Sequence, residues 1–246
     1  MNHLAVVMSS LVLIACGGGG GGGSSAPPPA TTAPVASSLS FPLKAAFSSR
    51  TASGATETLS ANSTVATRAV DGDCSGTLKR TTGPALAGAI FEGASVLSAV
   101  SVTTITFSNC TPASAIDTST SYFDTNYLPL GSSKLPSDYG VYLVPPTIPT
   151  SVKVGDVGVV GTQTIYFNSS KNSIPPIKAT VVSSYIVEAD TASTAIVNLI
   201  TKRYHLGSAS QPLFTEQARF RISSTGALTA MSVDIRYDSG LYLLFK

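Results

Sequence analysis

Few residues of this 246-residue chain have the types that catalysis needs, and their positions do not match the common arrangements. A Ser/His/Asp set needs an imidazole to accept the serine proton, and the chain has only His3 and His205. The G-x-S-x-G motif is missing, and the Ser-Gly pairs at Ser53, Ser75 and Ser239 are typical of turns. We therefore expect His205 to be a surface residue at a strand end, and we expect no catalytic residues of this kind.

Metal and cofactor sites also lack the residues that they need. Asp71-Gly72-Asp73 resembles the opening of a calcium loop, but no glutamate stands at the twelfth position of that loop. The globular region has too few histidines and cysteines for a tetrahedral zinc site, and phosphate-binding and dinucleotide-binding motifs are missing. We expect no metal and no cofactor. Thirteen acidic residues keep a carboxylate-dependent, glycosidase-like hydrolase as an alternative, because sequence spacing does not fix distance in space.

The three cysteines divide into Cys16, which ends an apolar run, and Cys74 with Cys110 in the globular region. If the chain is exported, it meets an oxidising compartment, where Cys74 and Cys110 are expected to form a disulfide. The loop that this bond closes would contribute about 4 kcal/mol to stability in the chain-entropy account. The alternative is a pair of buried free thiols.

Charged residues make up 11% of the chain, with 15 basic against 13 acidic groups. The only adjacent basic pairs are Lys79-Arg80 and Lys202-Arg203, so no basic stripe is present. We therefore expect no nucleic-acid partner.

The N-terminal run from Leu4 to Ala15 is almost wholly apolar but too short to span a bilayer, which is typical of a signal peptide. It ends in Leu13-Ile14-Ala15-Cys16, which resembles the lipobox of bacterial lipoproteins. The region before the apolar run departs from the family's pattern because it has no Lys or Arg, which leaves open whether Met1 is the natural start.

The lipobox resemblance implies cleavage before Cys16, a diacylglycerol on its thiol and an acyl chain such as palmitate on its amino group. The protein would then be held to a membrane by a lipid anchor. The resemblance also implies delivery to the outer membrane, because Gly17 stands where an Asp commonly signals retention in the inner membrane. It leaves open whether the protein faces the periplasm or the cell surface.

Residues 16–38 form a second region, after the signal peptide at 1–15. A glycine run from Gly17 to Gly23 is followed by Ser, Pro, Ala and Thr, which cannot build a core. This linker would hold the remaining domain, 39–246, roughly 25 to 60 Å from the lipid. It is either a selected tether or a low-complexity segment of no selected length.

The domain is expected to be all-β, an antiparallel meander that forms a sandwich or a barrel. Alternation is clearest in Glu216–Ser223, where Ala218, Phe220 and Ile222 share one face. Further strands are expected at Leu43–Ser48, Ser75–Thr81, Ala89–Glu92, Ala99–Cys110, Gly161–Phe167, Ala179–Val187, Thr194–Tyr204, Met231–Tyr237 and Leu241–Phe245. Gly88 and Gly93 argue against the alternative of a helix at Pro84–Leu97.

The segment from Thr111 to Thr150 is rich in Pro, Tyr and Asp and is expected to be a long connection. Its aromatic residues form the candidate binding surface, because exposed tyrosines make good contact anchors. These residues are Tyr122, Phe123, Tyr127, Tyr139 and Tyr142. The alternative is that the rings cap one end of the sheet core.

The region from Phe41 to Lys246 is similar to lipoproteins of Gram-negative bacteria that share the glycine tether. The similar stretches are Asp73-Cys74-Ser75-Gly76-Thr77, Asn109-Cys110-Thr111-Pro112 and Tyr127-Leu128-Pro129-Leu130-Gly131. This resemblance implies no activity. Together, the sequence favours a membrane-anchored envelope lipoprotein that binds an envelope protein or a small apolar ligand without catalysis.

Overall fold

The computed structural model describes residues 33–64, 74–108, 114–134, 136–207 and 210–246. The chain from Pro34 to Lys246 forms one compact unit. Its described part contains one helix and thirteen strands, which confirms the all-β prediction: α1 (Leu43–Ser53), β1 (Ala55–Thr64), β2 (Cys74–Thr82), β3 (Leu86–Phe91), β4 (Ala94–Ser108), β5 (Ser114–Phe123), β6 (Pro129–Lys134), β7 (Asp138–Tyr142), β8 (Val157–Tyr166), β9 (Ile177–Ala189), β10 (Thr194–His205), β11 (Phe214–Ser223), β12 (Leu228–Tyr237) and β13 (Tyr242–Phe245).

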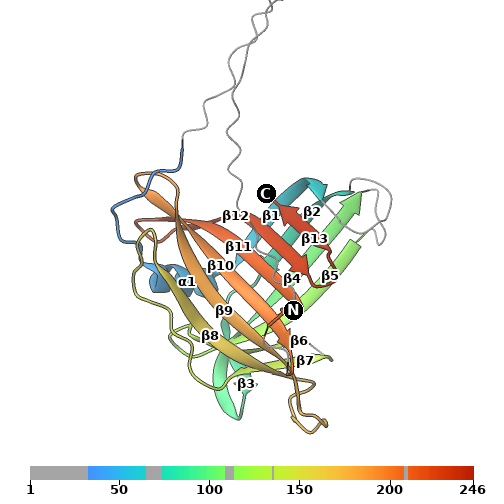
Figure 1. Cartoon of the computed structure of the whole chain (residues 1–246). Helices are drawn as coiled ribbons and strands as arrows, with labels where there is room; N and C mark the ends of the chain where they lie inside the picture. Colours follow the sequence, from blue (N-terminus) through green and yellow to red (C-terminus); the bar gives the residue numbers. More distant parts are fainter. Residues whose placement is uncertain (1–32, 65–73, 109–113, 135, 208–209) are drawn as a thin grey trace, which may run out of the picture. The chain divides into compact units, whose positions relative to one another are not determined.

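The strands form one antiparallel sheet in the order β1-β2-β4-β5-β6-β7-β8-β9-β10-β11-β12-β13, with β3 paired to β4 (Figure 1). The expected meander is therefore confirmed. The two outermost strands of this path also meet, because Ser60 and Lys246 exchange two backbone hydrogen bonds of 2.9 Å. The sheet is thus barrel-like rather than a sandwich, and alternate residues face its interior.

The interior is filled by side chains that pair across neighbouring strands. Val197 of β10 lies opposite Phe220 of β11, and Val233 of β12 lies opposite Phe245 of β13. At most 6% of any of these four residues is exposed. The alternation that the sequence shows in β11 is confirmed, since Ala218, Phe220 and Ile222 are all buried.

Helix α1 occupies the position where the sequence predicts a strand at Leu43–Ser48, so that prediction is wrong. Leu43, Ala46, Phe47 and Arg50 stand at i, i+3, i+4 and i+7, which places them on one face of a helix. Leu43 and Ala46 are buried in the same cluster as Phe41, and Phe47 packs against that cluster. Tertiary packing of this short face stabilises a helix although the segment is only weakly amphipathic.

The predicted long connection from Thr111 to Thr150 is also wrong, because it contains β5, β6 and β7. The sequence prediction also missed β1 altogether. These strands are rich in Ser, Thr and Gly, so they show no alternation of apolar and polar residues. Their backbones are instead held by pairing to neighbouring strands, for example β1 along most of β2.

The structure does not test the predicted lipidation site or the predicted disulfide. Cys16 and Cys110 lie outside the described residues, and of Cys74 only the backbone is described, at the start of β2. The neighbouring residue Ser75 pairs with Ser108, the last residue of β4. The disulfide and the lipid anchor therefore stay predictions. No helix in the described ranges is both long and apolar enough to cross a membrane.

Candidate functional site

One end of the barrel is covered by α1 together with residues 143–156, which connect β7 to β8 (Figure 1). Phe41, just before the helix, exchanges backbone hydrogen bonds of 2.8 and 2.9 Å with Val152. Thr147 donates a hydrogen bond of 2.7 Å to the carbonyl of Val160 in β8. Both Phe41 and Val152 are at most 1% exposed, so the cover is packed into the core rather than laid on the surface.

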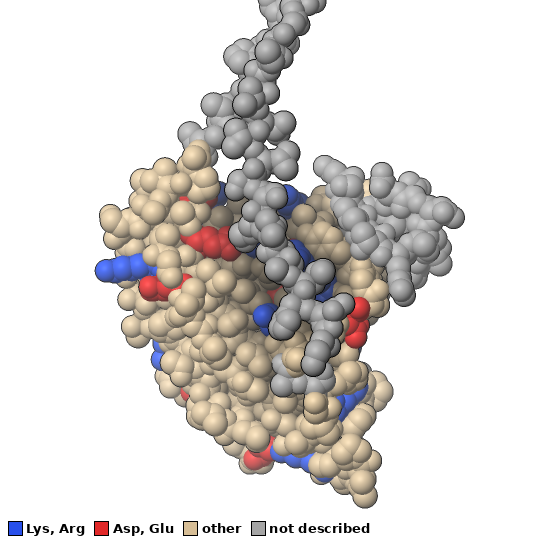
Figure 2. Space-filling model, in the orientation of Figure 1, with Lys and Arg blue, Asp and Glu red and all other residues tan. Residues whose placement is uncertain are grey.

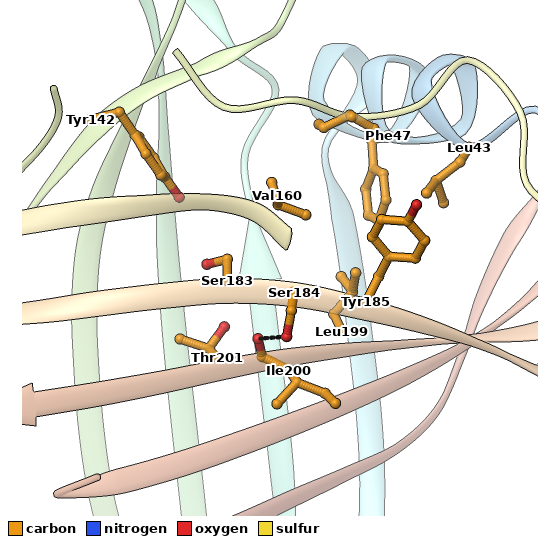
Figure 3. Close-up of a pocket in the computed structure, with 11 residues that line it drawn as sticks. Leu43, Phe47, Tyr142, Val160, Ser183, Ser184, Tyr185, Leu199, Ile200 and Thr201 are labelled. Carbon is orange, nitrogen blue, oxygen red and sulfur yellow. Dashed lines mark hydrogen bonds between the residues drawn. The ribbon is translucent and has the colours of Figure 1, made fainter. Parts of the chain in front are cut away.

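A pocket of about 150 Å³ lies between this cover and strands β8 to β10 (Figure 3). Its apolar wall is formed by Leu43 and Phe47 of α1, Val160 of β8 and Leu199 of β10, with the ring of Tyr185 beside them. The residues that line it in the described part of the chain carry no formal charge. The pocket is therefore suited to a neutral ligand, because burying a charge without a partner is costly.

Two glycines of β8 make room for the tyrosine rings beside this pocket. A Cβ atom at Gly158 would stand 2.7 Å from the ring of Tyr185, which lies opposite it in β9. A Cβ atom at Gly161 would stand 3.1 Å from the ring of Tyr142. Larger residues at either position would therefore push these rings out of place.

Hydroxyl groups form the polar wall of the pocket. Tyr142 of β7, Ser183 of β9 and Thr201 of β10 contribute them from three different strands (Figure 3). Burial raises the pKa of Tyr142, and a hydrogen bond with Ser183 opposes that effect. A neutral phenol at this position can both donate and accept a hydrogen bond.

An ion pair fixes the helix to the barrel wall. Arg50, in the last turn of α1, contacts the carboxylate of Glu57 in β1, whose side chain is only 5% exposed. The Arg50 guanidinium also lies 5.1 Å from the centre of the Phe220 ring. Burial and the nearby charge of Arg80 lower the pKa of Arg50. The pair therefore ties the cover to the strands that it closes.

The tyrosine set that the sequence suggested as a binding surface does not form one surface. The rings of Tyr122 and Tyr139 pack on Phe91, with ring centres 4.4 and 5.3 Å away. Burial, and then a hydrogen bond of 2.7 Å to Glu92, raise the pKa of Tyr139. Tyr139 belongs to a core cluster, and Tyr122 packs against that cluster.

The other three aromatic residues of that set lie in different places. Phe123 ends β5 and pairs with Leu97 and Pro129. Tyr127 has a φ of 60° in the turn before β6. Only Tyr142 lines the pocket beneath α1.

The acidic residues give little support to the hydrolase alternative. Ion pairs hold Glu57, Glu92, Asp117, Asp138, Glu188, Asp190, Glu216 and Asp234. Burial raises the pKa of Glu92 and of Asp138, but hydrogen bonds from basic side chains outweigh it, so both values lie below normal. The hydrogen bond from Arg221 lowers the pKa of Asp190. A catalytic general acid needs the opposite shift.

The described residues also show no histidine-based catalytic arrangement and no metal site. His205 ends β10 at the surface, as its position in the sequence suggested. No group of three His, Cys, Asp or Glu residues in the described ranges could hold a metal ion. On the face drawn in Figure 2, basic and acidic residues lie scattered among uncharged ones.

Sequence reasoning missed most of the pocket. Val160, Ser183 and Leu199 fall inside or beside predicted strands, but nothing in their local pattern marks them as pocket residues. The pair Gly158 and Gly161 within a β-rich run was the available signal, since glycine in a strand often marks a close approach. Compared with family profiles, curated proteins and solved structures, the chain matches none of them.

Proposed function

We propose that this protein is a lipid-anchored lipoprotein of the cell envelope whose barrel binds a small, mainly apolar molecule with one hydroxyl group. The pocket beneath α1 carries this proposal, because it joins an apolar wall to a wall of hydroxyl groups. Apolar cavities of about 150 Å³ in other proteins bind molecules the size of benzene. Phenol has that size and adds one hydroxyl, so it is the probe that best matches the pocket.

The ligand's ring would lie against Phe47, Val160 and Leu199, and its hydroxyl would face Tyr142 and Ser183. Removal of apolar surface from water favours the ring. The hydroxyl contributes less, since a neutral hydrogen bond adds about 1 kcal/mol net. The ligand's hydroxyl group decides which ligands bind, because a ligand that lacks this group leaves buried hydroxyl groups of the protein without a partner.

The proposal also places the protein in the envelope through the thiol of Cys16. The lipobox-like sequence before this residue and the glycine run after it support an anchor followed by a tether. The outer membrane is the proposed destination, with no choice between its two faces. Mass spectrometry of the mature protein tests this part, and a mature N-terminus other than acylated Cys16 would contradict it.

Calorimetric titration with phenol tests the ligand pocket. The whole chain carries Cys16→Ser for this purpose, so that no lipid is attached and no detergent competes for the probe. Val160→Phe fills the pocket and is expected to weaken phenol binding at least ten-fold. Val159→Phe is the matched control, because the neighbouring Val159 is 64% exposed.

Tyr142→Phe tests the polar wall separately. It removes one hydroxyl and is expected to weaken phenol binding about five-fold, which corresponds to one neutral hydrogen bond. Binding of benzene should change less than two-fold. Equal phenol binding by the Val160→Phe and Val159→Phe proteins would refute the pocket, whatever the result at Tyr142.

A further inference from the structure

A second cavity, of about 450 Å³, has none of its described lining residues in α1. Its described lining residues come from β2, β4, β5, β6, β10, β11 and β12. It differs from the pocket beneath α1 because charged side chains line it, among them Arg80, Arg203 and Glu216. The protein's proposed function does not use this cavity.

Positive charge exceeds negative charge near Arg203. Its guanidinium donates two hydrogen bonds, of 2.7 and 3.2 Å, to the carboxylate of Asp138. Lys178 donates a third hydrogen bond, of 2.7 Å, to the same carboxylate. Two cations therefore share one anion, and the partial burial of the three side chains reduces the screening of the excess charge by water.

The other charges of the cavity are balanced. Arg80 forms an ion pair of 3.0 Å with Glu216 and also donates a hydrogen bond of 3.2 Å to Thr103. Lys134 pairs with Asp117 at 2.6 Å, and about half of each of these two side chains is exposed. The excess of one positive charge thus belongs to the end of the cavity near Arg203.

Apolar side chains form the remaining wall. Ile105 of β4 and Ile235 of β12 line the cavity together with Phe214 and Tyr237. The rings of Phe214 and Tyr237 lie 6.1 Å apart and tilted, which is a favourable aromatic arrangement. A flat apolar body could lie against them while a charged group reached Arg203.

We propose that this cavity binds an organic anion with a flat apolar body. The anionic group contacts Arg203, whose planar guanidinium keeps donors that Asp138 does not use. The body lies against Phe214 and Tyr237. The ligand differs in class from the neutral ligand proposed for the pocket beneath α1, so the two proposals stand or fall separately.

Two probes that differ only in charge test this proposal: naphthalene-2-sulfonate and the neutral naphthalene-2-sulfonamide. They are titrated by calorimetry into the whole chain with Cys16→Ser. The sulfonate is expected to bind once per chain and at least ten-fold more tightly than the sulfonamide. Higher salt should weaken sulfonate binding, because ions screen the attraction.

Arg203→Gln is expected to weaken sulfonate binding at least ten-fold. Arg221→Gln is the matched control, because Arg221 also makes two hydrogen bonds to a carboxylate, that of Asp190, but does not line the cavity. It should bind the sulfonate within two-fold of the unsubstituted protein. Val160→Phe should also leave this binding unchanged, which separates the site from the pocket beneath α1.

Ala115→Trp provides a second test if Arg203→Gln fails to fold. Ala115 lines the cavity from β5, so the larger side chain is expected to occupy its volume and abolish sulfonate binding. Circular dichroism checks that the sheet is retained. Equal binding of sulfonate and sulfonamide, or equal losses in Arg203→Gln and Arg221→Gln, would overturn the proposal, and so would full binding by a folded Ala115→Trp protein.

Discussion

The neutral pocket and the charged cavity share one strand, β10, and use it for different chemistry. On β10, Leu199 and Thr201 line the neutral pocket beneath α1, whereas Arg203, two residues further along the same face, lines the charged cavity. The neutral pocket is covered by packed residues such as Leu43, and the charged cavity includes half-exposed residues such as Lys134. Solvent access explains the difference, because an ion loses much of its hydration when a protein segment covers it.

The largest effect is expected from breaking the ion pair at the covered end. Glu57→Gln leaves the partly buried Arg50 without its anion and should lower the free energy of unfolding by about 3 kcal/mol. Asp117→Asn breaks the exposed pair with Lys134 in the charged cavity and should cost about 0.5 kcal/mol. Urea unfolding of the two proteins measures both values. Equal losses would contradict the expectation that the more buried ion pair contributes more to stability.

The next effect concerns the size of the neutral pocket. Leu199→Ala removes part of its wall and should destabilise the protein by about 2 kcal/mol, since Leu199 is only partly buried. The enlarged pocket should then prefer indole to phenol. Calorimetric titrations with both probes check the preference. If the Leu199→Ala protein still prefers phenol, the ligand does not lie against Leu199.

Glycine at the edge of the pocket offers a sharper test of packing. Gly158→Ala brings a Cβ atom to within 2.7 Å of the Tyr185 ring and should cost about 1 to 2 kcal/mol. Gly83→Ala is the control, because its nearest neighbour would be 3.8 Å away. Thermal unfolding compares the two. A neutral result at Gly158 would show that the ring of Tyr185 moves freely.

The smallest effect is expected from the protonation of Asp138, the partner of Arg203, at low pH. The pKa of Asp138 in the folded protein lies below normal, so its stabilising contribution is complete above the unfolded value, about 4, and declines as pH falls below that value. Asp138→Asn lacks this contribution and should be about 1 kcal/mol less stable at pH 6. The difference between the two proteins should shrink towards pH 2.5. Unfolding in urea at both pH values measures it, and a constant difference would contradict the assigned pKa direction.

The C-terminal strands could be predicted because their two faces differ. In β11, Phe220 and Ile222 face the core, and Arg219 and Arg221 face outward, which is an alternation readable from the sequence. Strands β1 and β5 carry Ser and Thr on both faces, so the same signal is missing. Helix α1 was read as a strand because its apolar face is short and becomes visible only when it packs on the barrel.

The candidate sites could be predicted only in part. Tyr142 was among the aromatic residues that the sequence singled out, and it does line the neutral pocket. Its partners Ser183 and Leu199 lie 41 and 57 residues further along the chain, and only the register of β7 to β10 brings them to one place. Arg203 stands in an adjacent basic pair that, by itself, marks no site in the sequence. Its contact with Asp138 depends on the same long-range register.

Methyl NMR of the whole chain during a phenol titration tests the central claim most directly. Phenol should shift the methyl signals of Leu43, Val160 and Leu199 together and to saturation, because these residues line the pocket beneath α1. The methyl signals of Ile105 and Ile235, in the charged cavity, should stay in place. Saturable shifts at the two isoleucines, with none at the first three residues, would contradict the claim.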